Sequence, residues 1–162
     1  MRVVVGADHR GFEVRRQVIA VVQRLGHEVV DLGTFSDEAV DYPDIAAEAA
    51  RLVAEGKVDR GILICGTGVG MCITANKFAG VRAAPCHDDI TARMSRSHND
   101  ANVLCLSADM LGKRLIERMV EIWLATPFEG GRHLRRLEKI AAIERQLQRN
   151  RQEKEVGDTV NE

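Results

Sequence analysis

The sequence predicts an α/β fold in which five parallel strands form one sheet, and three observations support this. Short β-branched runs alternate along the chain with longer amphipathic stretches. Each of the five apolar runs is followed by a helical pattern, which is typical of a parallel sheet covered on both faces. At 162 residues and 45% hydrophobic content, the chain suffices for one core and is too short for two ordinary domains. With right-handed crossovers, we expect a Rossmann-like three-layer αβα sandwich.

The expected elements follow one another from the N-terminus. They are a strand at Arg2–Val5, a helix from about Phe12 to Leu25, a strand at Glu28–Leu32, a helix near Asp44–Glu55, a strand at Gly61–Cys65, a helix near Val69–Phe78, a strand at Val81–Ala84, a helix near Asp88–Ser97, a strand at Val103–Leu106 and a helix near Leu111–Leu124. After the Gly130-Gly131 pair, apolar residues at helical spacing from Leu134 to Leu147 predict an extra C-terminal helix. This helix either packs on a neighbouring subunit or folds back on its own domain. We expect a single domain over residues 1–150 and a disordered tail over 151–162, where apolar periodicity is absent.

Charge and composition exclude several classes of partner. The 23 basic and 24 acidic side chains give a formal net charge of −1, so no global field gathers nucleic acid or anionic lipid. No targeting segment and no membrane-spanning run is recognisable, which favours the cytoplasm. The four cysteines lack the spacing of a metal site, and we expect reduced thiols and no bound metal.

Chemistry-bearing residues gather next to the expected strands. In open α/β sheets, ligands bind beyond the carboxyl ends of the strands. The first strand is followed by Gly6–Gly11, the third ends in Cys65–Gly70, and Ser97–Asp100 precedes the fifth. We therefore expect an acid, imidazoles, a thiol and glycine amides to converge in one crevice.

The third strand leads into a glycine-rich loop. Gly66, Gly68 and Gly70 alternate with Thr67 and Val69, which leaves bare N–H groups for an anion at a helix N-terminus. This spacing is neither the dinucleotide fingerprint nor a Walker loop. A cysteine phosphatase loop requires an arginine six positions after the cysteine, and this chain has Met71 there. A tight turn without a ligand is the structural alternative.

Cys65 stands at the strand end facing this helix start, where its thiolate should be favoured as a base or nucleophile. The alternative is a core cysteine that serves only as a small hydrophobic residue. We interpret Cys72, Cys86 and Cys105 as structural residues of that kind.

Three further groups have a functional and a structural interpretation. His98 can act as an acid or base near neutral pH, or cap a helix. Asp8-His9 can bind a ligand at the crevice or form a turn. Arg132, His133, Arg135 and Arg136 suit phosphate oxygens, although each alone would normally lie on a solvated helix face.

Taken together, the motifs resemble ribose-5-phosphate isomerase type B of the ribose/galactose isomerase family. The resemblance covers residues 2 to about 145 and rests on six motifs in order. These are Gly6-Ala7-Asp8-His9-Arg10-Gly11-Phe12, Asp41-Tyr42-Pro43, Gly61-Ile62-Leu63-Ile64-Cys65-Gly66-Thr67-Gly68-Val69-Gly70, Ala75-Asn76-Lys77, Ser97-His98-Asn99-Asp100 and Glu129-Gly130-Gly131-Arg132-His133. It implies interconversion of ribose 5-phosphate and ribulose 5-phosphate in the pentose phosphate pathway, without metal or cofactor. It also implies a homodimer with active sites between subunits, and a dimer of such dimers stays open.

The resemblance also implies residue roles. Cys65 is similar to the base that moves a proton between C2 and C1. The group that holds the enediolate oxygen would be the backbone amides of Gly66, Thr67, Gly68, Val69 and Gly70, assisted by the Thr67 side chain. His98 is similar to the residue that opens the furanose ring. Asp8 and Asn99 correspond to groups that bind the sugar hydroxyls, and His9, Arg132 and Arg136 to phosphate contacts. Independently of the family, ring opening followed by carbon deprotonation requires two distinct acid-base groups, and His98 and Cys65 supply them.

One position departs from the family pattern. Many members would carry an arginine near the phosphate where this chain has Asp109, and a carboxylate facing the pocket would repel a dianion. Asp109 either faces the pocket or pairs with a basic neighbour. The departure leaves room for a hexose phosphate, such as allose 6-phosphate or galactose 6-phosphate. The sequence is also compatible with a non-catalytic sugar-phosphate sensor and with a thiol redox protein that uses Cys65 and Cys72.

Overall fold

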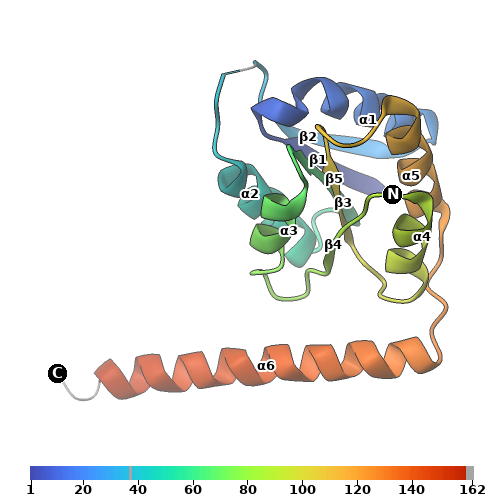
Figure 1. Ribbon diagram of the computed structural model, residues 1–162. Coiled ribbons are helices and arrows are strands. Elements are labelled where there is room, and N and C mark those ends of the chain that lie inside the picture. Colours follow the sequence, from blue (N-terminus) through green and yellow to red (C-terminus); the bar gives the residue numbers. More distant parts are fainter. Residues whose placement is uncertain (37, 160–162) are drawn as a thin grey trace. The chain divides into compact units, whose positions relative to one another are not determined.

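The computed structural model describes residues 1–36 and 38–159, with side chains up to residue 153. The chain forms two compact units, Met1–Phe128 and Glu129–Glu162. The first unit contains a sheet of five parallel strands in the order β2-β1-β3-β5-β4 (Figure 1). Its elements are β1 (Arg2–Ala7), the 3₁₀ helix η1 (His9–Gly11), α1 (Phe12–Arg24), β2 (Glu28–Gly33), α2 (Tyr42–Ala54), β3 (Arg60–Cys65), α3 (Val69–Ala75), β4 (Ala83–Pro85), α4 (Asp89–Ser97), β5 (Val103–Ser107) and α5 (Lys113–Ala125). The predicted three-layer α/β fold is confirmed.

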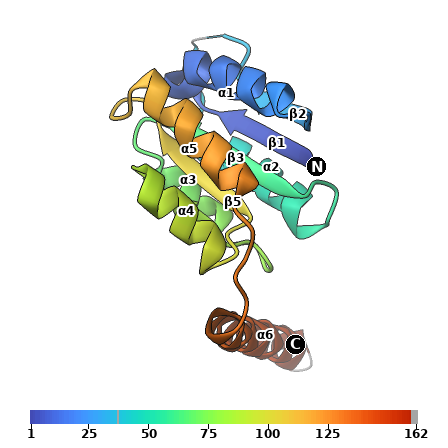
Figure 2. The ribbon, with the colours of Figure 1, turned by 90° about the vertical axis from the view of Figure 1, so that its right-hand side faces the viewer.

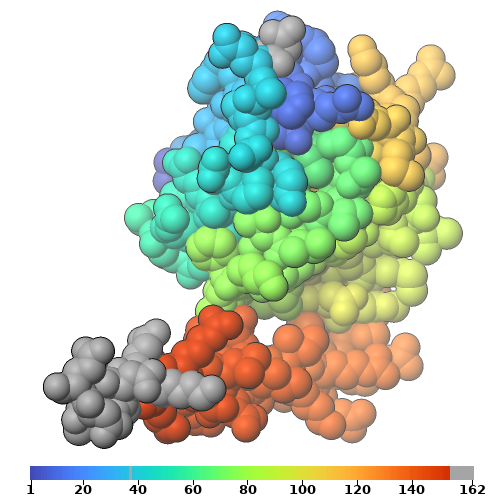
Figure 3. Space-filling view, turned by 60° about the vertical axis from the view of Figure 1, so that its left-hand side comes forward, coloured from blue at the N-terminus to red at the C-terminus, as the bar shows by residue number. Residues whose placement is uncertain are grey.

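Helices cover both faces of the sheet because successive strand residues point to opposite sides. On one face, Ile62 and Ile64 of β3 pack in a cluster with residues of α1, α4 and α5, including the fully buried Trp123 (Figure 2). On the other face, Leu63 and Cys65 pack with residues of α2 and α3. Helices α2 and α3 lie side by side there, teal and green in Figure 3. The side chain of Cys65 therefore belongs to the α2–α3 face.

The edge strand β4 is shorter than the predicted strand Val81–Ala84. The Asn76 side chain accepts from the N–H of Ala83 at 2.9 Å and donates to its carbonyl at 2.9 Å. The Arg82 N–H donates to Oδ1 of Asn102 at 2.7 Å. Since asparagine side chains satisfy the backbone beside β4, little ladder is left for a longer strand.

The second unit consists of a short lead-in and the helix α6 (Arg132–Thr159). The predicted extra helix is present, and it extends into the segment 151–159 that we expected to be a disordered tail. Arginine, glutamine, glutamate and lysine occupy positions 151–155 and have high helix propensity, whereas Val156, Gly157, Asp158 and Thr159 are poorer helix formers. Residues 160–162 of the expected tail lie outside the described residues. None of the helices in the described part of the chain has both the length and the apolarity of a membrane span.

Candidate active site

The strand order creates a switch point between β1 and β3. From β1 the chain continues to β2 on one side, whereas β3, β5 and β4 lie on the other side. Crevices at such points, outside the carboxyl ends of the strands, are the usual ligand sites of open α/β sheets. Here the chain places Asp8 and η1 after β1, the glycine loop after β3, and Ala108-Asp109 after β5.

Cys65 is the last residue of β3 and is 5% exposed. Its Sγ lies 3.2 Å from the backbone nitrogen of Gly68, whose N–H donates to the sulfur. Gly68 has φ of +79°, and a Cβ at this position would lie 3.1 Å from the backbone of Leu106. Only glycine meets both the left-handed conformation and the close approach to β5. The loop therefore curls back over the sulfur and presents an N–H group to it.

The turn after β5 fixes the other side of this loop. The N–H of Ala108 donates to the carbonyl of Cys65 at 2.9 Å, and the N–H of Asp109 donates to the carbonyl of Gly66 at 3.1 Å. The Ser107 hydroxyl donates to the same Gly66 carbonyl at 2.6 Å. Within the loop, the Val69 N–H donates to Oγ1 of Thr67 at 3.3 Å. These bonds preorganise the loop, which is what stabilisation of a developing oxyanion requires.

Asp8 has a structural task in the described chain. It is 5% exposed, and its Oδ1 accepts from the backbone N–H groups of Arg10 at 3.0 Å and Gly11 at 3.2 Å. Asp8 is thus the N-cap of η1. A Cβ at Gly11 would lie 2.8 Å from the side chain of Ile64, so η1 lies directly against β3.

His9 and Arg10 on η1 border an open hollow. The Nδ1 of His9 lies 3.3 Å from the backbone nitrogen of Val40. When Nδ1 accepts that N–H, Nε2 carries the ring proton and can donate to an anion. The hollow has a volume of about 550 Å³ and is lined by His9, Arg10, Phe12, Glu13 and Ser36. It has room for a small phosphorylated molecule.

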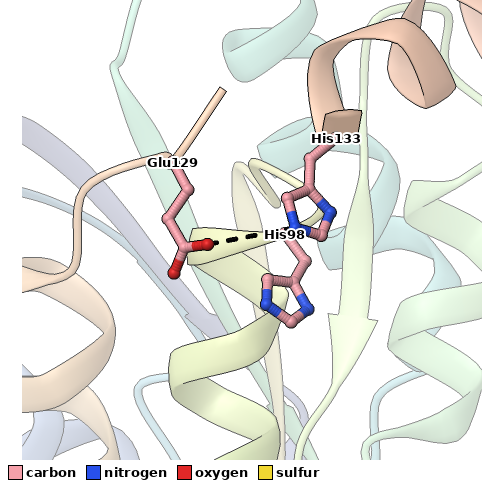
Figure 4. Close-up of side chains that lie close together, drawn as sticks. All are labelled: His98, Glu129 and His133. Atoms are coloured by element: carbon pink, nitrogen blue, oxygen red, sulfur yellow. Dashed lines mark ion pairs between the residues drawn. The ribbon is translucent and has the colours of Figure 1, made fainter. Parts of the chain in front are cut away.

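His98 and Asn99 lie at the opposite edge of the sheet from Cys65, so one chain by itself does not bring them into the crevice beside Cys65. His98 is the C-cap of α4 and precedes β5 (Figure 4). The Arg82 side chain, which precedes β4, donates to the Asn99 carbonyl at 3.2 Å. The amino edge of a parallel sheet is separated from its carboxyl edge by the strands, and the five residues of β5 alone span about 16 Å. Residues that precede a strand therefore cannot reach the loop that follows its neighbour.

Arg132 and Arg136 are both on α6, in the second unit. They stand one turn apart and so share a helix face. The Arg132 Nε lies 3.4 Å from Nε2 of His133, which also lies 3.9 Å from a carboxylate oxygen of Glu129 (Figure 4). Both arginines are exposed, so their guanidinium groups can contact an anion.

The remaining cysteines are buried free thiols. A hydrogen bond from Cys105 lowers the pKa of Cys72 to about 7, and the same contact raises the pKa of Cys105 well above its ordinary value. Burial raises the pKa of Cys86. Cys65 and Cys72 are both free thiols, and the Sγ of Cys72 donates to the Ala83 carbonyl at 3.3 Å.

Sequence reasoning assigns no role to Tyr42 or Arg10. A Cβ at Gly70 would lie 2.6 Å from the ring of Tyr42, so this ring packs directly on the glycine loop. Arg10 pairs with Asp109, its Nη2 lying 2.6 Å from Oδ2. Both residues lie within the sequence motifs that carry the family resemblance, and this is the sequence feature that could have pointed to them. Their contacts depend on the meeting of distant segments.

This arrangement is that of a small open-sheet α/β protein with a thiol and a glycine loop at its switch point. Residues 3–140 match the Ribose/Galactose Isomerase family, and the chain belongs to this family. It is 48% identical to ribose-5-phosphate isomerase B of Escherichia coli over 143 residues, which are 88% of this chain and 96% of that protein.

Solved structures of proteins named ribose-5-phosphate isomerase B have the same fold as this chain. Ribose-5-phosphate isomerase B of Clostridium thermocellum has a TM-score of 0.88 and 46% identity, covering 91% of this chain and 99% of that one. The Mycoplasma genitalium enzyme, solved with bound ribulose-5-phosphate, has a TM-score of 0.86 and 40% identity, covering 89% and 96%.

Proposed function

We propose that this chain is an isomerase that interconverts ribose 5-phosphate and ribulose 5-phosphate through an enediolate. The observation that carries the proposal is the thiol of Cys65 held in the glycine loop at the switch point, with the Gly68 N–H 3.2 Å from its sulfur. Membership of the family and the names of the relatives support the reaction and the substrate. The reaction belongs to carbohydrate metabolism, in the pentose phosphate pathway.

In this proposal Cys65 is the general base. As a thiolate it removes the proton from C2 of the open-chain aldose and returns it to C1, while the hydroxyl proton moves from O2 to O1. The oxygen charge of the enediolate develops beside the loop. The amides of Gly66 to Gly70 and the Thr67 hydroxyl stabilise that oxygen, and each preorganised donor contributes about 3 kcal/mol. The chemistry needs neither a metal nor a cofactor, since the proton moves between adjacent carbons.

His98 opens the furanose ring in the proposed mechanism, and Asn99 binds the sugar hydroxyls with Asp8. Because His98 and Cys65 lie at opposite edges of one sheet, a site with both needs two copies of the chain. We therefore propose a homodimer in which His98 of one subunit faces Cys65 of the other. His9, Arg132 and Arg136 bind the phosphate.

Helix α6 is consistent with such a dimer. Ile140, Ile143 and Leu147, at positions i, i+3 and i+7 of this helix, are exposed apolar residues that share one face. A helix in water gains most of its stability from packing an apolar face, so this face favours a partner surface. We place the enzyme in the cytoplasm, where its four free thiols remain reduced.

A coupled isomerase assay across pentose and hexose phosphates tests the proposal. We expect ribose 5-phosphate to be turned over with the highest kcat/KM. Preference for allose 6-phosphate or galactose 6-phosphate would move the assignment to a hexose phosphate. Binding without isomerisation of any of these sugars would overturn the enzymatic proposal in favour of a sensor.

A further inference from the structure

An ion pair joins two sides of the crevice. Arg10 follows β1 and Asp109 follows β5, and they meet across the end of β3, with Nη2 of Arg10 2.6 Å from Oδ2 of Asp109. The side chains are 56% and 40% exposed, respectively. The pair therefore lies at the surface of the crevice and is accessible to a ligand.

The pair covers the start of the glycine loop. A Cβ at Gly66 would lie 2.9 Å from Oδ2 of Asp109 and 3.9 Å from Nε of Arg10. The backbone of Asp109 is fixed separately, because its N–H donates to the Gly66 carbonyl at 3.1 Å. Asp109 is thus anchored to the loop, and Arg10 reaches over to it from η1.

Arg10 also borders the hollow of about 550 Å³ together with His9. A guanidinium that makes one hydrogen bond to a carboxylate keeps further N–H donors, because arginine carries five. Those donors suit a phosphate, which arginine binds in a planar, two-point manner. The Asp109 carboxylate is the anion that a phosphate would have to share or displace.

Resting on the proposed function, we propose that Arg10 is a phosphate-binding residue for the sugar-phosphate substrate and that Asp109 competes with the phosphate for it. Asp109 holds the guanidinium at the crevice while the site is empty. When the substrate binds, its phosphate takes donors of Arg10, and the carboxylate weakens this binding by occupying the same cation. Arg10 is thereby a specificity residue for phosphorylated over free sugars.

Two variants that break the same ion pair separate this role from a structural one. Arg10→Gln removes the cation. We expect the KM for ribose 5-phosphate and the inhibition constant of inorganic phosphate to rise about tenfold, because one charge-assisted hydrogen bond to the phosphate is lost. The kcat should stay within about threefold, because Arg10 does not touch the reacting carbons. Asp109→Asn removes the competitor and leaves the cation, so both constants should fall.

A structural ion pair would give a different result, since both variants would then weaken binding alike. That outcome, or an unchanged phosphate inhibition constant in Arg10→Gln, overturns the proposal. Calorimetric titration of the full-length protein and both variants with inorganic phosphate measures the same contrast without turnover. If no sugar is isomerised at all, the proposed function fails, and the titration still decides the role of Arg10.

Discussion

Gly68 illustrates how single residues shape the site. Its φ of +79° belongs to the left-handed region, and its Cα approaches the backbone of Leu106 so closely that a Cβ would be 3.1 Å away. The N–H that reaches the Cys65 sulfur comes from this same residue. The sequence pattern Gly-x-Gly-x-Gly predicts a tight loop, whereas the contact with β5 depends on the packing of two strands.

We predict that Gly68→Ala lowers both stability and activity. A left-handed non-glycine residue costs about 1–2 kcal/mol, and crowding against Leu106 adds to this. Gly26→Ala is the matched control, because Gly26 has φ of +78° and open space around its Cα. Urea unfolding of both variants measures the difference. Equal losses of unfolding free energy in the two variants would show that the close approach to β5 has no energetic weight.

Asp8 and Asp109 mark the limits of residue-level prediction from sequence. Because Asp8 directly follows the first strand, the sequence predicts that it lies in the crevice. Its role as the N-cap of η1 depends on the local backbone geometry, which the sequence position alone does not determine. For Asp109 the sequence allows two orientations, and the structure selects the pair with Arg10. A contact between residues 99 positions apart is not encoded in any local pattern.

At the scale of elements, α4 shows how a helix is bounded by its own sequence. Asp88 and Thr91 form a capping box at its start, with the Thr91 N–H donating to Oδ1 of Asp88 at 2.7 Å. This bond and the Thr91 hydroxyl lower the pKa of Asp88. At its other end α4 carries His98 as the C-cap. The cap thus stabilises the helix that presents the proposed ring-opening residue.

We predict a pH-dependent effect of removing this cap. Because the pKa of Asp88 in the folded chain is below the ordinary value of 3.8, its stabilisation is present above about pH 3.8 and is lost as the pH falls through the folded pKa. Asp88→Ala should therefore melt below the parent protein at pH 7, and the difference should shrink in acid. Thermal melts across this range measure it.

Asp88→Ser is the control for this prediction, because serine also caps a helix but carries no charge. Asp88→Ser should retain most of the stability of the parent protein at pH 7. The small difference in melting temperature between them should shrink in acid, where the Asp88 carboxylate loses its charge. A constant difference between Asp88→Ala and the parent from pH 7 to pH 3 would refute the role of the carboxylate.

Element types are predictable because strand and helix periodicities differ, and all five strands and the helices between them occur in the predicted order. The errors lie at boundaries. The predicted helix Val69–Phe78 ends at Ala75, where the Asn76 side chain bonds to the Cys72 carbonyl at 3.1 Å. The expected tail is helical to Thr159. Helix propensity explains this extension as far as Glu155, because the residues from Arg151 to Glu155 are good helix formers.

At the scale of the whole molecule, the sheet divides the proposed catalytic groups between its two edges. Cys65, Asp8 and the glycine loop lie at the carboxyl edge, and His98 lies at the amino edge. The sequence suggests one crevice for all of them because each lies next to a strand. Whether a residue precedes or follows its strand decides the edge, and the position of His98 is the reason why the proposed mechanism includes a second subunit.

We predict that two inactive variants complement each other. Mixing subunits that carry Cys65→Ala with subunits that carry His98→Asn gives heterodimers with one doubly altered site and one intact site. After unfolding and refolding equal amounts together, activity on the cyclic sugar should recover to about a quarter of the parent value, as random pairing of a symmetric dimer requires. Activity no higher than the mean of the two variants would exclude a site shared between subunits.

The mechanism depends on the thiol of Cys65 acting as the base, and the exchange of the C2 proton of ribose 5-phosphate in deuterated water measures this directly. In Cys65→Ala we predict that exchange falls by about two to four orders of magnitude while the sugar phosphate still binds. In Cys72→Ala, which removes the thiol paired with Cys105, exchange should continue. Exchange at the parent rate in Cys65→Ala would contradict the proposed mechanism.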